Sequence, residues 1–390
     1  MVVIHFPDLT LATALGVVFL EWVRRAMWMK KFRTKNPPIL PSSDPAIREK
    51  ISVIVPARDE EQNIGNCLSH LIKQDHPDYE IIVVDDRSND RTGHLVENFK
   101  KLSPVPLKLV RIEKLPEGWT GKNHAMMAGS KAASGVRLLF TDADTTHETH
   151  SLRSSLATAV AKNADFLTLA PQVECRSFWE NVVQPLAVSS LALWFKTAEL
   201  NEPGSKTVLA NGQFILVKKI AYEAIGGNES VKNEVVEDVE LAKKIKAAGY
   251  SVLFLNGTLL YSTRMYTSLG QIFKGWTRIF IHLFEKKILP IIHKIFLFLF
   301  FSIFPFVVLG VEKIFLFTGS PSFSPILFWL SSAVCAVIIT SRFVGNKLLR
   351  TNPWYALLHP VASVVMTWLL LICVGRILFK GRSEWRGDLH

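Results

Sequence analysis

The sequence VRLLFTDAD at residues 136–144 joins an apolar run to two carboxylates, Asp142 and Asp144. Strand side chains alternate between two faces, so residues two apart point the same way. At the carboxyl end of a strand, such a pair can hold a hard divalent cation, with phosphate oxygens completing its coordination. Solvated loops also contain Asp-x-Asp, so the meaning of this pair depends on the rest of the chain.

The neighbouring sequence alternates short β-rich runs with helical stretches. We expect strands at residues 51–55, 80–84, 107–111, 136–140, 166–169, 252–255 and 259–261, and helices at residues 60–73, 90–101, 123–133, 149–162 and 237–248. This alternation predicts an α/β domain with a mostly parallel sheet and helices on both faces. In such sheets, ligands bind beyond the carboxyl ends of the strands.

Acidic residues follow three of these strands, within residues 56–60 (PARDE), 85–88 (DDRS) and 141–144 (TDAD). Carboxylates gathered at one edge repel each other unless a cation or ligand donors lie among them. A carboxylate at Asp85 or Asp86 can accept a hydrogen bond from a uracil-type base or a ribose hydroxyl. Helix capping by Ser88 or Asp90 explains the same segment equally well.

Two predicted helices begin with residues suited to chemistry. Lys122 follows Gly121 at the start of one helix, where the helix dipole disfavours a cation, so its presence indicates an anion nearby. Glu237 and Asp238 begin another helix. A carboxylate there can act as a general base, although acidic residues in a first helical turn are also ordinary partners of the helix dipole.

Apolar segments at both ends of the chain indicate a membrane protein. The sequence has 390 residues, 49% hydrophobic content and a net charge of +11. Its basic residues cluster beside apolar segments, which suits an anionic membrane surface and not a nucleic acid. We expect a signal anchor near residues 9–28, an interfacial helix at 268–285 and spans near 291–309, 325–344 and 354–378. Residues 178–200 suit an amphipathic helix that lies in the core or on the membrane surface.

The basic residues after the first apolar segment place the following domain in the cytoplasm by the positive-inside rule. Three later spans would then put Lys380 and Arg382 outside, against the same rule, and the sequence alone leaves this conflict open. The four cysteines, Cys67, Cys175, Cys335 and Cys373, are far apart and show no metal-binding spacing, so we expect them to be reduced.

The motifs, taken in order, resemble those of family 2 glycosyltransferases with the GT-A fold, and most closely the membrane-attached members that glycosylate lipids. Among these are ceramide glucosyltransferases and bacterial enzymes associated with hopanoids and carotenoids. The residues that carry the resemblance are Pro56–Glu61, Val84–Ser88, Gly121–Asn123, Asp142–Asp144, Asn211–Gln213, Glu237–Asp238 and Gln271–Trp276.

The resemblance implies a role for each matching residue. Asp238 would be the catalytic base, with Glu237 beside it, and Asp144 with Asp142 would bind Mg²⁺ or Mn²⁺. In the motif Gln271–Trp276, Lys274 replaces the arginine that is usual in the family, and Gly275 separates Lys274 from Trp276. The implied substrate-binding residues are Pro56, Ala57, Glu60, Asp85, Asp86, Lys122, Asp142, Asn211, Gly212, Gln213, Arg264, Gln271, Lys274 and Trp276.

These features predict a multi-pass inner-membrane enzyme that moves a sugar, with inversion, from a nucleotide-diphosphate sugar to a lipid acceptor. UDP is the donor nucleotide most usual in the family. The predicted parts are an anchor at residues 1–35, a cytosolic GT-A domain at 36–265, an interfacial helix at 266–288 and membrane helices with a tail at 289–390. The alternatives are a processive polysaccharide synthase and a non-enzymatic module that binds nucleotide sugars.

Overall fold

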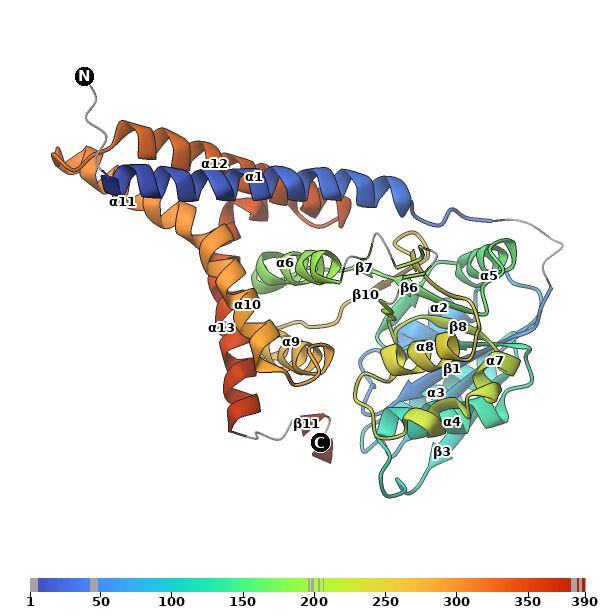
Figure 1. Cartoon of the computed structure of the whole chain (residues 1–390). Coiled ribbons are helices and arrows are strands. Elements are labelled where there is room, and N and C mark those ends of the chain that lie inside the picture. The colour runs from blue at the N-terminus through green and yellow to red at the C-terminus, as the bar shows by residue number, and fades with distance from the viewer. Residues whose placement is uncertain are drawn as a thin grey trace. The chain divides into compact units, whose positions relative to one another are not determined.

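The chain folds as two compact units in a computed structural model, drawn in Figure 1, which describes residues 6–42, 48–195, 197, 200–202, 204–205, 207–379, 384–385 and 388–389. The α/β unit comprises Asn36–Glu174, Phe195–Met265 and Glu384–His390. The helical unit comprises Met1–Lys35, Cys175–Trp194 and Tyr266–Ser383. Residues 175–194, which the sequence analysis placed in the GT-A domain, therefore group with the helices.

The α/β unit contains a seven-stranded sheet. Its order is β3 (Leu107–Ile112), β2 (Tyr79–Asp86), β1 (Ile51–Ala57), β4 (Arg137–Phe140), β8 (Ile215–Lys218), β6 (Phe166–Ala170) and β9 (Val252–Asn256). Neighbouring strands are parallel except where β8 pairs with β4 and β6. The predicted mostly parallel α/β fold is confirmed, while the antiparallel strand β8 was not among the predicted strands.

Helices cover both faces of this sheet. One face packs against α2 (Ile64–Leu71), α3 (Thr92–Leu102) and α5 (Ser151–Ala161). The other packs against α4 (Gly121–Ala132), α7 (Lys219–Ala224) and α8 (Glu237–Ala247). In β1, Val53 and Val55 belong to the first core and Ile54 to the second. Both faces are thus apolar, as a buried parallel strand requires.

The register of the central strands brings their carboxyl ends to one edge. Ala57 at the end of β1 lies beside Asp85 of β2, and Ile54 lies beside Phe140 of β4. A small second sheet follows, in which β10 (Tyr261–Thr263) pairs with β5 (Thr145–His147) and β7 (Gln172–Val173). Because β5 begins directly after Asp144, this sheet fixes the segment that carries the two aspartates.

The helical unit contains α1 (Phe6–Lys35), α6 (Phe178–Trp194), α9 (Leu269–Leu283), α10 (Ile288–Phe298), α11 (Phe304–Thr318), α12 (Pro325–Leu348) and α13 (His359–Leu378). The π-helix η3 (Leu299–Ile303) joins α10 to α11, and the 3-10 helix η4 (Pro353–Leu358) precedes α13. The α/β unit adds η2 (Gly227–Val231), and short strands β11 (Glu384–Trp385) and β12 (Asp388–Leu389) pair near the C-terminus.

Three helical segments are long and apolar enough to cross a membrane: Ile288–Thr318, Pro325–Leu348 and Pro353–Leu378. Large apolar side chains are exposed on them, including Phe317, Trp329 and Trp368. The predicted N-terminal anchor is not among the three, and charged residues interrupt the sequence of α1. The basic tail at residues 380–382 lies outside the described residues.

Glu80 of β2 shows how the α/β unit accommodates a buried charge. Its side chain is 2% exposed and accepts hydrogen bonds from Ser52 Oγ at 2.7 Å, Ser134 Oγ at 2.6 Å and Lys108 Nζ at 2.7 Å. Burial alone would raise the pKa of this carboxyl, but these bonds hold the pKa at about 2. Because the folded pKa lies below the unfolded one, the charge stabilises the fold above about pH 4.5, and this stability is lost as the pH falls toward 2.

We predict that Glu80→Gln lowers the free energy of unfolding at pH 7 by roughly 1–3 kcal/mol, because the partners of a buried charge lose their charged acceptor. Thermal unfolding of the full-length protein in detergent measures this. Glu97→Gln is the control, since Glu97 is an exposed carboxylate on α3. Equal midpoints for the two variants would show that the Glu80 network contributes nothing.

Candidate active site

Lys122 lies at the centre of a charged cluster beyond the carboxyl edge of the sheet. It occupies the first turn of α4, where its Nζ is 2.9 Å from Oδ1 of Asp142 and 2.9 Å from Oε1 of Glu237. Burial would lower the pKa of this ammonium, but the charges of Asp142 and Glu237 raise it above its ordinary value. Lys122 therefore stays charged, and it joins the loop after β4 to the start of α8.

Gly212 forms one wall of this cluster. Its backbone N–H donates to Oδ2 of Asp238 at 2.7 Å. A Cβ at this position would lie 3.0 Å from Lys122 Nζ, 3.2 Å from Glu237 Oε1 and 3.3 Å from Asp238 Oδ2. Four groups thus converge on one small volume, which a side chain at residue 212 would fill.

Asp238 is a carboxyl whose protonation is altered by its surroundings in this cluster. Its Oδ1 accepts the N–H of Val239 at 2.8 Å, and its Oδ2 accepts that of Gly212. Burial, followed by the negative charge of Glu237, raises the pKa of Asp238 to about 7, although Lys122 acts in the opposite direction. A carboxyl with such a pKa can take up a proton near neutral pH.

Asp142 and Asp144 share one face of their segment. Both are partly exposed, whereas Thr141, Ala143 and Thr145 between and beside them are buried. The backbone of this segment is fixed, because Thr145 Oγ1 donates to the carbonyl of Asp142 at 2.7 Å. Both residues lie in the turn between β4 and β5, and their joint binding of one ligand stays a prediction.

The two aspartates fit a divalent cation by their chemistry. Carboxylate oxygens are hard ligands of the kind that Mg²⁺ and Mn²⁺ prefer. Within the described part of the chain, no third His, Cys, Asp or Glu joins them in a group that could hold a metal ion. Phosphate oxygens or water would therefore have to supply the remaining ligands.

The loops after β1 and β2 are bound tightly to each other. The backbone N–H groups of Asp59, Glu60 and Glu61 donate to Ser88 Oγ, Thr92 Oγ1 and Asp90 Oδ2. Asp90 also accepts the N–H of Thr92 at 2.9 Å, so it supports the start of α3. Pro56 and Ala57 end β1 at the base of these loops.

Asp85 and Asp86 take different positions at the end of β2. Oδ1 of Asp85 accepts the N–H of Ser88 at 3.1 Å, which supports the turn. Asp86 forms an ion pair with Arg87 at 2.8 Å, and a Cβ on Gly121 would collide with its Oδ2. Asp86 therefore lies against the first turn of α4, one residue from Lys122.

Residues 211–213 connect the cluster to both sheets. Asn211 Nδ2 donates to the Tyr261 hydroxyl at 2.9 Å and to the Leu169 carbonyl at 3.1 Å. Gln213 Nε2 donates to Thr263 Oγ1 at 3.0 Å. These side chains are engaged with the protein and hold Gly212 in place, so any contact that they make with a substrate stays a prediction.

The remaining predicted residues lie further along the chain. Arg264 follows β10 in the α/β unit, whereas Gln271, Lys274 and Trp276 belong to α9 of the helical unit. Lys274 and Gln271 are exposed, but Trp276 is 3% exposed and its Nε1 donates to Gln184 Oε1 at 2.5 Å. The structure thus places Trp276 inside the helical unit, where its predicted role in binding substrate stays a prediction.

A close contact accounts for the glycine at residue 275, between Lys274 and Trp276. A Cβ at Gly275 would collide with the ring of Tyr266, which lies against α9 within the same unit. Sequence reasoning also missed that Glu237 is a direct partner of Lys122, because the two residues are more than a hundred positions apart. A lysine in a first helical turn was the one signal that pointed to nearby anions.

Part of the chain is similar to a known protein family. Residues 52–226 match the family model described as Glycosyl transferase family 2. This part of the chain is a family 2 glycosyltransferase domain. The predicted resemblance is therefore confirmed for these residues, which include Asp142, Asp144 and Gly212 but not Glu237 or Asp238.

Relatives from several Staphylococcus aureus strains, named 4,4'-diaponeurosporenoate glycosyltransferase, are 26% identical over 232 residues. The match covers 58% of this chain and 60% of each relative's length. A solved structure, the mannosyltransferase PcManGT from Pyrobaculum calidifontis in complex with GDP-Man and Mn²⁺, is similar to this chain with a TM-score of 0.54 and 19% sequence identity. The match covers 95% of this chain and 99% of the PcManGT chain. This likeness supports the GT-A fold.

We predict that Gly212→Ala lowers the rate of sugar transfer by at least tenfold, an effect of roughly 1.4 kcal/mol on the barrier, because the new methyl group displaces Lys122 or the carboxylates. Donor turnover by the purified protein measures this. Gly65→Ala is the matched control, since Gly65 lies on α2 and a Cβ there would make an ordinary 3.7 Å contact with Phe99 of α3. Full activity in Gly212→Ala would contradict the assigned site.

Proposed function

We propose that the chain transfers a sugar from a nucleotide-diphosphate sugar to a membrane lipid, with inversion at the anomeric carbon. The observation that carries this proposal is the cluster in which Lys122 bridges Asp142 and Glu237, with Asp238 beside it. A cation and a carboxyl of raised pKa at one site are suited to stabilising a leaving diphosphate and to accepting a proton. The family 2 domain and the names of its relatives support the same activity.

In this proposal the donor's diphosphate binds at the Lys122 side of the cluster. The ammonium of Lys122 offsets the charge that develops on the leaving group. Asp142 and Asp144 would hold a divalent cation, which would neutralise the diphosphate further when bound. Asp85 and Asp86 lie at the adjacent strand end, where the nucleoside would bind, and UDP is the nucleotide most usual among such enzymes.

Asp238 would act as the general base toward an acceptor hydroxyl. Its carboxyl is held by two backbone N–H groups, so its direction is fixed. The hydroxyl oxygen attacks the anomeric carbon as the bond to the diphosphate breaks, and Asp238 receives the hydroxyl proton. A single displacement of this kind needs no covalent intermediate and inverts the configuration.

The acceptor would be an apolar molecule within the membrane. Three long apolar helical segments with exposed aromatic side chains support a multi-pass membrane location. The basic residues that end α1 support a cytoplasmic position for the chain that follows, in the inner membrane. The relatives' name designates diaponeurosporenoate, a carotenoid acid, as the molecule that those enzymes glycosylate.

That name also favours a second candidate, in which the acceptor is a carboxylate. A carboxylate is already deprotonated at neutral pH, so its attack on the sugar requires no base. The two candidates therefore differ in what they require of Asp238, while both require the charges around Lys122.

We predict that Asp238→Asn lowers the rate of transfer to a hydroxyl acceptor by about 10²–10⁴-fold. In the unmodified protein, this rate should rise with pH through about 7, because Asp238 must lose its proton to act as a base. Initial rates between pH 5.5 and 8.5 measure both effects. Glu240→Gln is the control, since Glu240 lies in the same helical turn but pairs with Lys243.

Retained transfer to hydroxyl acceptors in Asp238→Asn would refute the base assignment. If the variant loses transfer to hydroxyl acceptors but keeps transfer to carboxylate acceptors, the second candidate is supported. The variant should fold, because the ionised form of Asp238 is disfavoured by burial and by Glu237, and the asparagine carbonyl can still accept one of the two backbone N–H groups. A single cooperative unfolding transition at pH 8, as in the unmodified protein, checks this.

We predict that EDTA abolishes transfer and that added Mn²⁺ or Mg²⁺ restores it. The reason is that the proposed cation, held by Asp142 and Asp144, would neutralise the leaving diphosphate. Asp144→Asn should raise the metal concentration needed for half-maximal rate by at least about tenfold. Titration of the metal into EDTA-treated protein measures this. Undiminished activity in EDTA would exclude a required divalent ion.

A further inference from the structure

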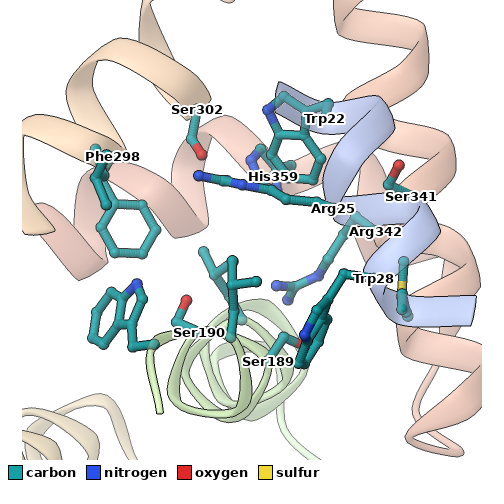
Figure 2. A pocket seen from close by; sticks show the side chains of 16 residues that line it. Trp22, Arg25, Trp28, Ser189, Ser190, Phe298, Ser302, Ser341, Arg342 and His359 are labelled. Atoms are coloured by element: carbon teal, nitrogen blue, oxygen red, sulfur yellow. The ribbon is translucent and has the colours of Figure 1, made fainter. Parts of the chain in front are cut away.

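A cavity in the helical unit lies among α1, α6, α10, η3, α12 and α13. Most of its wall is apolar and aromatic, with side chains that include Trp22, Trp28, Leu193 and Phe298. Figure 2 shows that the guanidinium groups of Arg25 and Arg342 both point into this space. The cavity therefore combines an apolar lining with positive charge.

Arg342 on α12 carries an uncompensated charge. It is 5% exposed, and its Nη2 donates to the carbonyl of Val182 at 3.1 Å. Its Nε and Nη1 have no hydrogen-bond partner in the part of the chain that the structure describes. A buried guanidinium with unmet donors is costly, so these two groups call for an acceptor that the described part of the chain does not supply.

Arg25 on α1 provides a comparison within the same cavity. Its Nε is 2.8 Å from Glu21, and its guanidinium lies over the rings of Trp22 and Phe301. The charge of Arg25 is therefore already balanced, whereas no described carboxylate forms an ion pair with Arg342. None of the residues that line the cavity is Asp or Glu.

His359 at the start of α13 adds to the unmet polarity. It is fully buried, and neither of its ring nitrogens has a hydrogen-bond partner among the described residues. Its ring lies against Trp22, with the centroids 5.5 Å apart. A ligand that enters the cavity would thus meet a cation, an imidazole and aromatic faces.

We propose that this cavity binds the anionic headgroup of a membrane lipid, with Arg342 as its principal donor. The guanidinium fork suits the oxygens of a phosphate or carboxylate. The apolar wall, on helices long enough to cross a membrane, favours an amphipathic ligand over a soluble anion. This inference goes beyond the proposed function, because it requires no sugar transfer.

Lipid-dependent thermal unfolding of the full-length protein in a neutral detergent tests the inference. The probes are phosphatidylglycerol, phosphatidylcholine with the same acyl chains, and inorganic phosphate. We expect phosphatidylglycerol to raise the unfolding midpoint with a saturable dose response, and the other two probes to give little or no shift. An equal response to phosphatidylcholine, or to inorganic phosphate alone, would overturn the proposed ligand.

Two variants assign the response to Arg342. Arg342→Gln should weaken the apparent affinity for phosphatidylglycerol by about tenfold or more, and Arg342→Lys should retain part of it because the charge remains. Arg350→Gln is the matched control, because Arg350 is an exposed cation just after the same helix. An unchanged affinity in both Arg342 variants would overturn the assignment, and the lysine variant keeps the test valid if the glutamine variant does not fold.

Discussion

The ion pairs of Lys122 with Asp142 and Glu237 are the constraint on which the candidate site depends. A cation in the first turn of a helix is opposed by the helix dipole and by burial. It persists because two carboxylates, one after β4 and one at the start of α8, lie 2.9 Å from it. Three segments distant in sequence are thereby held together, and the position of each limits the other two.

This constraint also determines how the acidic residues differ from one another. Glu237 pairs with Lys122 directly, while Asp238 is held by backbone N–H groups and feels the charge of Glu237. The two neighbours are thus placed in unlike environments, and burial with the charge of Glu237 raises the pKa of Asp238 to about 7. In the function we propose, this difference separates charge balance around the diphosphate from proton transfer at the acceptor.

Much of the α/β unit could be predicted from the sequence, because its buried strands are short apolar runs that end in turn residues. For example, a strand was predicted at residues 51–55, and β1 begins at the same residue and ends slightly later, at Ala57. β8 was not predicted, and neither was the grouping of α6 with the other helices of the helical unit. Both depend on tertiary packing, which local periodicity does not encode.

The site was predicted less completely than the fold. The spacing of Asp142 and Asp144 predicted that their carboxylates share one ligand, and this stays a prediction because both residues lie in the turn after β4 and not in a strand. The approach of Glu237 to Lys122, and the space left by Gly212, depend on how α8 packs on the sheet. Arg342 lies within the span predicted at residues 325–344, but the burial of its side chain depends on packing that the sequence pattern does not show.

The central claim is that this cluster transfers single sugars to an apolar acceptor. The most direct measurement is mass spectrometry of lipid extracts after incubation with the purified full-length protein and a panel of nucleotide sugars. We predict new lipids that are heavier by one sugar residue and require the donor. A ladder of sugar polymer, or donor binding without transfer to any lipid, would contradict this account.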